Sequence, residues 1–486
     1  GQFSGKSKGS SAGKGLSSQV ERRLMLYQLL KPVAVTGINL FFNSISVENQ
    51  ERIPNKGPVI FAANHPNTMM DPLIVGTNCD RRVSILAKST LFSNKVFAWF
   101  FGLIGIIPVY RKIDAEGDMD RNEEMFASAY RHLEKGHALL IFPEGISTPE
   151  RIIHKIKTGA ARIGLGAEAN NDFNLNVQIV PAGINYSAGT KFRSDVHCRF
   201  GRPIAMRDFQ DQYEADDWSA VQAVTTQLRQ ALKKLTTTVT DQANANIVQS
   251  LETIYKKELT VDLGMDKYSK DDEFKVSKGI IRAVEWFSDN KPKWSHKLKQ
   301  SIMQYISILD KLKIRDDFLS TSRSKVTLGR RLQSWFFLVF GFPIFIYGWI
   351  LNYLPYKLSG ILAVRAVKGH YADLSSKKML FGMGLFIVWY AGILVLSYNI
   401  IDDGIWTALF FLTFIPSGNF TLLYFRKAQN YGQHLRFMSI FYQKRKLLYQ
   451  LIEKRISIIH ELNRAKEEYF SKNIRKNSSE DLSDFK

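Results

Sequence analysis

The chain has 486 residues, 45% of them hydrophobic, which is enough for two or three domains and a sizeable core. Its formal net charge of +21 favours anionic membrane surfaces or anionic substrates, and no nucleic-acid partner is expected because no DNA- or RNA-binding signature accompanies the charge. Two cysteines, Cys79 and Cys198, cannot build a disulfide framework or a Cys-rich metal site, and no histidine pair has zinc-hydrolase spacing.

Residues 1–19 are rich in Gly, Ser and Lys and contain no apolar core, unlike a signal peptide or a transmembrane helix. We expect a flexible tail or a cloning remnant here. Over residues 20–235, apolar strand-like runs alternate with helical stretches, such as Glu123–Glu134 before Ala138–Ile141, which predicts an α/β domain with a largely parallel sheet. The last helix of this region is expected to face the core with Trp218, Val221, Val224, Leu228, Leu232 and Leu235.

A histidine and an aspartate follow the first of these apolar strands. Pro58–Ala63 has the pattern of a buried strand, and His65 and Asp71 come shortly after it. In such a pair the imidazole takes a proton from a hydroxyl, and the carboxylate fixes its tautomer and stabilises the cation. On a continuous helix, two side chains six positions apart point to different faces. If His65 and Asp71 are to meet, a loop must bring Asp71 back to His65, with the helix beginning near Pro72. Alternatively, Asp71 is a helix cap and His65 an ordinary loop residue.

Three further segments continue the pattern along the chain. One is an apolar run ending in a cation, one follows a strand, and one is a strand with a turn inside it: Gly105–Arg111, Phe142–Ser147 and Ile179–Tyr186. With Asn64–Asp71 they resemble the four blocks of the glycerolipid acyltransferase superfamily. Lys157–Arg162 and Phe200–Ile204 are similar to that family as well, and the resemblance covers about residues 35–235.

The resemblance implies a glycerol-3-phosphate-acyltransferase-like catalytic domain that transfers a fatty acyl group to glycerol 3-phosphate in phospholipid synthesis. Five residues lie between His65 and Asp71, where the commonest pattern of the superfamily has four. This spacing is similar to that of fungal-type glycerol-3-phosphate or dihydroxyacetone-phosphate acyltransferases and of related bacterial proteins. Two alternatives stay open: a lysophosphatidate or other lysolipid acyltransferase, and a membrane lipid-binding protein on the same fold without catalytic activity.

The mechanism that the resemblance implies uses His65 to deprotonate the acceptor hydroxyl, which then attacks the thioester of acyl-CoA or acyl-carrier protein, while Asp71 orients His65. No covalent enzyme intermediate is expected, because the thioester is already an activated donor. No metal and no cofactor beyond this co-substrate are expected either. The acceptor phosphate needs a cation, and Arg111 is the first candidate because a guanidinium binds phosphate oxygens bidentately.

The remaining site candidates have weaker support. Lys88, Lys157 and Arg162 are further cations for the phosphate. Glu144 is expected to contact glycerol hydroxyls or to clamp Arg111, and Gly145 beside it allows close approach or a positive φ. Pro181 is assigned to the acyl groove. Ser147 and Thr148 precede Pro149 and predict an ordinary helix start, so neither is assigned to catalysis.

Residues 236–330 form a charged region with helical patterning, in which four side chains are expected to pack rather than bind a ligand: Trp286, Phe287, Tyr305 and Ile308. Residues 331–428 form a membrane region with three apolar runs: Trp335–Leu354, Met379–Ile401 and Ile405–Phe425. Basic residues flank the first run on both sides, so we expect it to be re-entrant with a break at Gly341-Phe342-Pro343, and a simple span is the alternative. The other two form a hairpin.

Residues 429–486 predict an amphipathic helix followed by a polar tail. Its apolar side carries Phe441, Leu448, Ile452, Ile459 and Leu462. Three placements stay open: on the membrane surface, against a partner helix in an oligomer through residues 430–468, or on its own domain. The whole pattern predicts an integral membrane protein whose catalytic domain lies on the cytoplasmic face of a bacterial inner membrane or the endoplasmic reticulum, with membrane lipids, the acyl donor and a phosphorylated glycerol acceptor as partners.

Overall fold

The structure is a computed structural model that describes residues 28, 30–88, 106–109, 119–240, 242–320, 328–367 and 369–473. The chain divides into two compact units. The first, here called the sheet unit, contains the chain up to Thr236 together with Val367–Met379. The second, the helical unit, contains Thr237–Ala366 and the chain from Leu380 onward. The tail over residues 1–19 and the phosphate candidate Arg111 lie outside the described residues.

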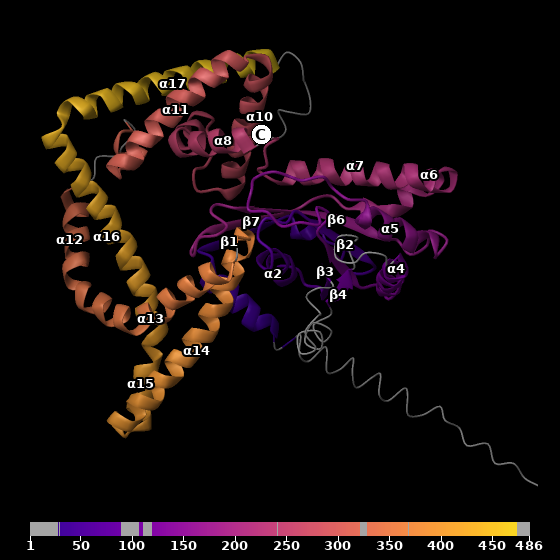
Figure 1. The fold of residues 1–486 in the computed structure, drawn as a ribbon, viewed down its shortest axis with the longest axis horizontal. Helices are drawn as coiled ribbons and strands as arrows, with labels where there is room; N and C mark the ends of the chain where they lie inside the picture. Colours follow the sequence, from indigo (N-terminus) through magenta and orange to yellow (C-terminus); the bar gives the residue numbers. More distant parts are fainter. Residues whose placement is uncertain are drawn as a thin grey trace, which may run out of the picture. The chain divides into compact units, whose positions relative to one another are not determined.

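One eight-stranded sheet forms the centre of the sheet unit, with strand order β1-β7-β6-β2-β5-β3-β4 and β8 paired to β6 (Figure 1). Neighbouring strands are parallel except where β6 meets β7 and β8, so the predicted α/β fold with a largely parallel sheet is confirmed. The strands are β1 Ser44–Glu48, β2 Val59–Ala63, β3 Val83–Lys88, β4 Ile107–Val109, β5 Ala138–Ile141, β6 Gln178–Tyr186, β7 Asp195–Phe200 and β8 Ile204–Ala205.

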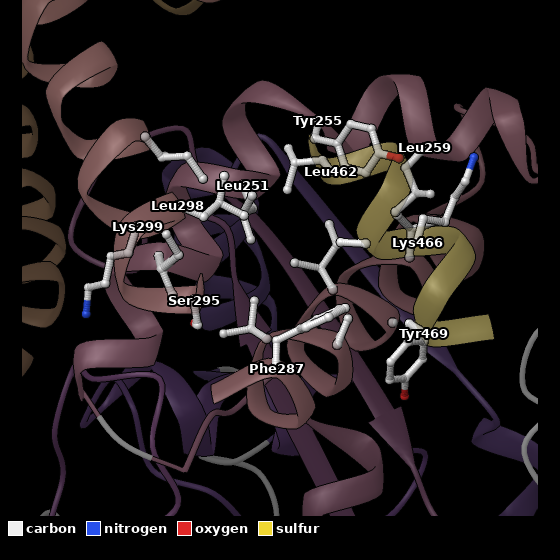
Figure 2. Close-up of a pocket in the computed structure, with 18 of the residues that line it drawn as sticks. Leu251, Tyr255, Leu259, Phe287, Ser295, Leu298, Lys299, Leu462, Lys466 and Tyr469 are labelled. Atoms are coloured by element: carbon white, nitrogen blue, oxygen red, sulfur yellow. The ribbon is translucent and has the colours of Figure 1, made fainter. Parts of the chain in front are cut away.

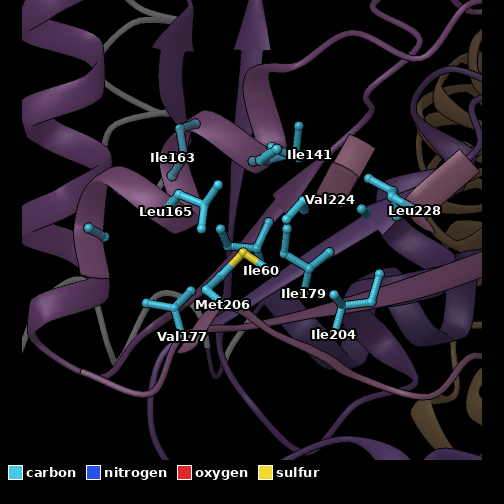
Figure 3. Packing of buried hydrophobic residues seen from close by; sticks show 14 of the residues in the cluster. Ile60, Ile141, Ile163, Leu165, Val177, Ile179, Ile204, Met206, Val224 and Leu228 are labelled. Atoms are coloured by element: carbon cyan, nitrogen blue, oxygen red, sulfur yellow. The ribbon is translucent and has the colours of Figure 1, made fainter. Parts of the chain in front are cut away.

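Helices accompany the sheet, as the alternating pattern predicts. They are Leu30–Phe41, α2 Met70–Thr77, α4 Met119–Glu134, α5 Gly159–Ala169, α6 Gln210–Ala215 and α7 Asp217–Leu235. Figure 3 shows Ile60 and Ile179 of the sheet packed with Leu165 of α5 and Val224 of α7. Every residue of β2 is buried, as expected for a strand that has a hydrogen-bonded parallel neighbour on each side and packed faces.

One core assignment on α7 is wrong. Val221, Val224, Leu228, Leu232 and Leu235 are buried, but Trp218 is 56% exposed. Trp218 stands in the first turn, where its backbone N–H bonds to the N-cap Asp216, and the buried stretch of the helix begins only at Ala220. Helical spacing predicted the buried face correctly but not where along the helix the burial starts.

The helical unit contains a bundle formed by α8 Gln242–Ile254, α9 Lys256–Asp262, α10 Lys270–Asn290, α11 Pro292–Leu312 and α17 Arg445–Asn473. A mainly apolar cavity of about 100 Å³ lies among them, and Figure 2 shows Leu251, Phe287 and Leu462 around it. Phe287 and Tyr305 are buried, as packing residues should be. Leu448 and Leu462 of α17 are also buried, so this side of the helix is covered by its own chain.

A buried ion cluster ties α17 into this bundle. Arg455 is only 4% exposed and donates from Nε and Nη2 to the Asp316 carboxylate at 3.0 to 3.2 Å. Its Nη2 also donates to Glu258 at 2.8 Å, and the Tyr305 hydroxyl donates to Asp316 at 2.5 Å. Each charge in the cluster therefore has a partner, which is the condition for burying charges.

Two helices in the described part of the chain are long and apolar enough to cross a membrane, Tyr371–Ile401 and Gly404–Phe437. A third apolar stretch is a pair bent by 50°, Leu332–Phe340 and Phe342–Ala366, and its break falls at Gly341 within the predicted segment. The bend is consistent with Pro343, which cannot donate a backbone hydrogen bond. The helices here are α12 Leu328–Phe340, α13 Phe342–Ala366, α14 Leu374–Ile401, α15 Gly404–Leu412 and α16 Phe414–Gln443.

Candidate active site

The site is built at the carboxyl end of β2, where the chain leaves the sheet. Asn64 follows the strand and is buried. Its side chain accepts a hydrogen bond from the Ile184 N–H at 2.7 Å and donates one to the Ile184 carbonyl at 3.0 Å. This two-way bond fixes the end of β2 against β6, and His65 is the next residue.

His65 and Asp71 meet across the following loop. His65 Nδ1 lies 2.9 Å from Asp71 Oδ2, and the same oxygen accepts the Asn67 N–H at 2.7 Å. The helix α2 begins at Met70, two residues before the predicted start, so Asp71 stands in its first turn rather than at its cap. Asp71 is fully buried, and an anion is favoured near a helix N-terminus. The loop therefore returns Asp71 to His65 as the spacing required.

Tyr186 is a third member of this group that the sequence analysis did not single out. Its hydroxyl donates to Asp71 Oδ1 at 2.7 Å, so both carboxylate oxygens are engaged. Burial, and then the neighbouring Asp71 carboxylate, raise the pKa of Tyr186 well above its usual range. The hydroxyl consequently stays protonated and acts as a donor. The available signal was its place at the end of β6, beside the end of β2 that carries His65.

The His65 ring is held on its face as well as its edge. It stacks on Phe142 with centroids 3.9 Å apart and an interplanar angle of 16°. The side chain keeps 18% of its surface exposed. A carboxylate is an acceptor only, so Asp71 places the imidazole proton on Nδ1 and leaves the Nε2 lone pair as the base. No described residue bonds to Nε2, so this nitrogen is available to take a proton from a substrate hydroxyl.

Glu144 bridges two backbone segments beside the histidine. Its Oε1 accepts the His65 N–H and its Oε2 the His154 N–H, both at 3.1 Å. Burial raises the pKa of the Glu144 carboxyl, and these two N–H donors partly offset that effect. The structure thus gives Glu144 a role in holding the His65 loop. Its contact with glycerol hydroxyls or with Arg111 stays a prediction.

The segment after Glu144 also supports the loop. Gly145 has φ of 68°, in agreement with the positive φ expected there. Thr148 N–H donates to the His65 carbonyl at 3.2 Å, and Ser147 Oγ accepts the Thr68 N–H at 3.0 Å. The predicted helix start at Ser147 or Thr148 is wrong, because residues 147–157 are irregular and α5 begins at Gly159. The backbone and side-chain groups here bond to the histidine loop instead of to a helix.

The predicted substrate cations differ in what the structure shows of them. Lys157 is exposed, and its Nζ would lie 2.5 Å from a Cβ built on Gly145, so the ammonium lies beside the Glu144-Gly145 turn. Arg162 is exposed on α5 with its guanidinium carbon 4.7 Å from the centre of the Phe126 ring. Lys88 closes β3. Their contact with a phosphate stays a prediction for all three.

Two further assignments concern the acyl groove and metals. Pro181 is buried in β6 opposite Ala62, and Gly201 donates to its carbonyl at 2.8 Å. Its role in an acyl groove stays a prediction. Within the described ranges, no group of three or more His, Cys, Asp or Glu residues could hold a metal ion.

Part of the chain is similar to known acyltransferases. Residues 44–185 match a family model described as Acyltransferase. The chain is 23% identical over 407 residues to glycerol-3-phosphate O-acyltransferase 1 of Saccharomyces cerevisiae, covering 66% of this chain and 52% of that protein. It is 26% identical over 196 residues to glycerol-3-phosphate O-acyltransferase 2 of the same yeast, covering 40% and 25%.

A bacterial protein is also similar to part of this chain. The chain is 27% identical over 201 residues to 1-acyl-sn-glycerol-3-phosphate acyltransferase of Streptococcus pneumoniae, covering 39% of this chain and 66% of that protein. The chain spans about half the length of the first yeast relative. The matched residues contain the histidine, its aspartate partner and the loop that supports them. Residues 44–185 therefore resemble the Acyltransferase family, and the named relatives of the chain are acyltransferases that act on glycerol phosphates.

Proposed function

We propose that the protein is a membrane-bound O-acyltransferase that moves a fatty acyl group from acyl-CoA or acyl-carrier protein to glycerol 3-phosphate. The observation that carries this proposal is the contact of His65 Nδ1 with Asp71 Oδ2 at 2.9 Å, which leaves Nε2 without a bonding partner among the described residues. An imidazole held in this way has the arrangement of a general base for a hydroxyl group.

In the proposed reaction, the residues of this site act directly on the two substrates. His65 Nε2 takes the proton of the acceptor hydroxyl as its oxygen attacks the thioester carbon. The tetrahedral intermediate expels the thiolate, which recovers a proton from the imidazolium, so an ester forms and a thioester breaks. Asp71 stabilises the imidazolium between these steps. Tyr186 and the Asn67 N–H hold Asp71 in place.

The acceptor is assigned from the relatives and from the motif spacing. Both yeast relatives are named glycerol-3-phosphate O-acyltransferases. Five residues lie between His65 and Asp71, a spacing similar to the fungal type. A second candidate acceptor is lysophosphatidate, because the Streptococcus relative is named a 1-acyl-sn-glycerol-3-phosphate acyltransferase. In both cases the acceptor carries a phosphate monoester, for which Arg111, Lys157, Lys88 and Arg162 are the proposed cations.

Membrane attachment follows from the apolar helices. Tyr371–Ile401 and Gly404–Phe437 have the length and composition of spans, and the acylated product is a lipid. We propose that the sheet unit lies on the cytoplasmic side, because basic residues such as Arg330, Arg331, Arg426 and Lys427 flank the apolar runs. The proposed partners are the acyl donor, the glycerol acceptor and membrane lipids, with no nucleic acid. An oligomer through residues 430–468 stays a prediction.

An acceptor panel tests this function. The full chain is purified in detergent, returned to lipid, and incubated with a labelled acyl donor and glycerol 3-phosphate, dihydroxyacetone phosphate, lysophosphatidate or glycerol. We expect glycerol 3-phosphate to be acylated fastest and unphosphorylated glycerol to be a poor acceptor. Faster acylation of lysophosphatidate would favour the second candidate. No transfer to any acceptor, with tight lipid binding, would instead identify a non-catalytic lipid-binding protein.

A further inference from the structure

A short segment far along the chain belongs to the sheet unit. Val367–Met379 follows α13, contains the 3-10 turn Tyr371–Asp373 and ends within the first residues of α14. Ala372, Ser375 and Ser376 in this segment are buried. The helix α14 then continues without a break to Ile401 as one of the two candidate membrane spans. The first residues of this apolar helix therefore belong to the sheet unit.

This segment bonds directly to the loop that carries the histidine. The hydroxyl of Thr68, midway between His65 and Asp71, donates to the Ala372 carbonyl at 3.1 Å and lies 3.2 Å from Ser376 Oγ. Thr68 has φ of 29°, which is rare for a β-branched residue. Such a backbone persists only where the surroundings hold it. Here the holding groups are Ser147 on the backbone N–H and the 367–379 segment on the hydroxyl.

The segment also bonds to a second loop of the site. Ser375 Oγ donates to the Gly189 carbonyl at 2.5 Å, and Lys378 Nζ donates to the Thr190 carbonyl at 2.9 Å. The same Gly189 carbonyl accepts the Asn67 side chain at 2.9 Å. Gly189 lies three residues after Tyr186, which donates to Asp71. The loop after Tyr186 and the loop between His65 and Asp71 are therefore both bonded to the 367–379 segment.

We propose that Val367–Met379 positions the active site, with Thr68 and Ser376 as positioning residues that hold His65 and Asp71 in the reactive geometry. The expected effect on catalysis rests on the proposed acyl transfer. The contact of Thr68 with Ala372 and Ser376 does not depend on that function. Because Ser376 lies in the first turn of α14, the geometry of the histidine loop depends on how that apolar helix begins. The product of the proposed reaction is a lipid. The loop that carries His65 is therefore supported by the first turn of a helix that is itself a candidate membrane span.

The variants Ser376→Ala and Thr68→Val test this link, since each removes one hydroxyl with little change in size. Ser397→Ala is the matched control: Ser397 lies on the same helix and is buried, but its hydroxyl donates only to Leu394 within the helix, at 2.9 Å. All are compared as full chains in lipid nanodiscs.

The first measurement is amide hydrogen exchange over residues 64–71. The N–H groups of His65, Asn67, Thr68 and Met70 are all bonded in this loop, so they report on its opening. We expect faster exchange in Ser376→Ala and Thr68→Val and no change in Ser397→Ala. Unchanged exchange in both test variants, or an equal change in the control, overturns the proposal. This readout does not need turnover, so it decides the link even if the wild type transfers no acyl group.

The second measurement is steady-state acyl transfer by the same proteins. Ser376→Ala should lose roughly 2- to 13-fold in kcat, the range for one hydrogen bond, with KM for both substrates nearly unchanged. Thr68→Val should lose at least as much, because it also removes the bond to the Ala372 carbonyl. The double variant should be no worse than about Thr68→Val alone, because that change already removes the contact with Ser376 as well as the bond to the Ala372 carbonyl. Faster exchange with normal kcat would show a purely structural contact and would overturn the positioning role.

Discussion

The Tyr186 hydroxyl donates a 2.7 Å hydrogen bond to Oδ1 of Asp71, the carboxylate whose other oxygen faces His65. These two residues are 115 positions apart and come from the fourth and first blocks of the family pattern. The bond fixes the rotation of the carboxylate, which in turn orients the imidazole. Tyr186 is therefore expected to act on catalysis through Asp71 rather than by touching substrate.

The variant Tyr186→Phe should lower kcat by roughly 2- to 13-fold, the effect of losing one hydrogen bond, with KM little changed. The loss of this donor frees one carboxylate oxygen of Asp71, so the carboxylate should hold the imidazole orientation less firmly. Phe42→Leu is the control, because the Phe42 ring packs 5.7 Å from the Tyr186 ring and carries no hydroxyl. An equal loss of kcat in that control would point to packing instead.

The variant Arg111→Ala should raise KM for the phosphorylated acceptor by roughly ten- to 150-fold and leave KM for the acyl donor little changed. A charged hydrogen bond contributes about 1.5–3 kcal/mol, and a phosphate monoester needs a cation in a partly dry site. Arg111→Lys keeps the charge without the bidentate geometry and should fall between. A rise in the donor KM alone would assign Arg111 to the donor phosphates, and unchanged kinetics would make it a surface charge.

Acid should destabilise the sheet unit through His132. Burial, and then the neighbouring His137, lower the pKa of His132 to about 4, and its Nε2 is buried without a hydrogen-bond partner among the described residues. The folded state therefore binds the proton less well than the unfolded state, so this contribution to stability is complete above about pH 6.5 and is lost as pH falls towards 4. His132→Gln should flatten the fall of Tm between pH 7 and pH 4.5. An identical pH dependence in the two proteins would contradict this assignment.

The helical unit should depend strongly on Arg455. Its guanidinium is paired with the buried Asp316 and the half-buried Glu258, so Arg455→Met leaves the buried Asp316 carboxylate without a compensating charge. We expect a loss of about 3–5 kcal/mol, visible as a lower Tm. Lys257→Met is the matched control, because the Lys257 side chain is 76% exposed in its pair with Asp317 and should contribute less than about 1 kcal/mol. Equal losses would mean that the buried cluster is not special.

Local patterns predicted much of the fold and part of the site. The apolar run that forms β2 follows from periodicity, and the motif that carries His65 and Asp71, with helix geometry, indicated that a loop would have to join them. The contacts of Tyr186 with Asp71 and of Thr68 with Ser376 join residues 115 and 308 positions apart, and no periodic pattern encodes such pairings. The exposure of Trp218 could not be predicted for a related reason. The spacing of apolar residues shows which face of a helix is buried, but not how far along the helix the packing extends.

The most direct test of the account is the acyl-transfer rate of His65→Ala, measured on the full chain in lipid with glycerol 3-phosphate and a labelled acyl donor. Removal of a general base typically costs about 10²–10⁴-fold, and we expect a loss in that range in a protein that keeps the Tm of the wild type. Asp71→Asn should also be severe, since the amide cannot stabilise the imidazolium as a carboxylate does. Near-normal transfer by folded His65→Ala protein would contradict the central claim that His65 is the base.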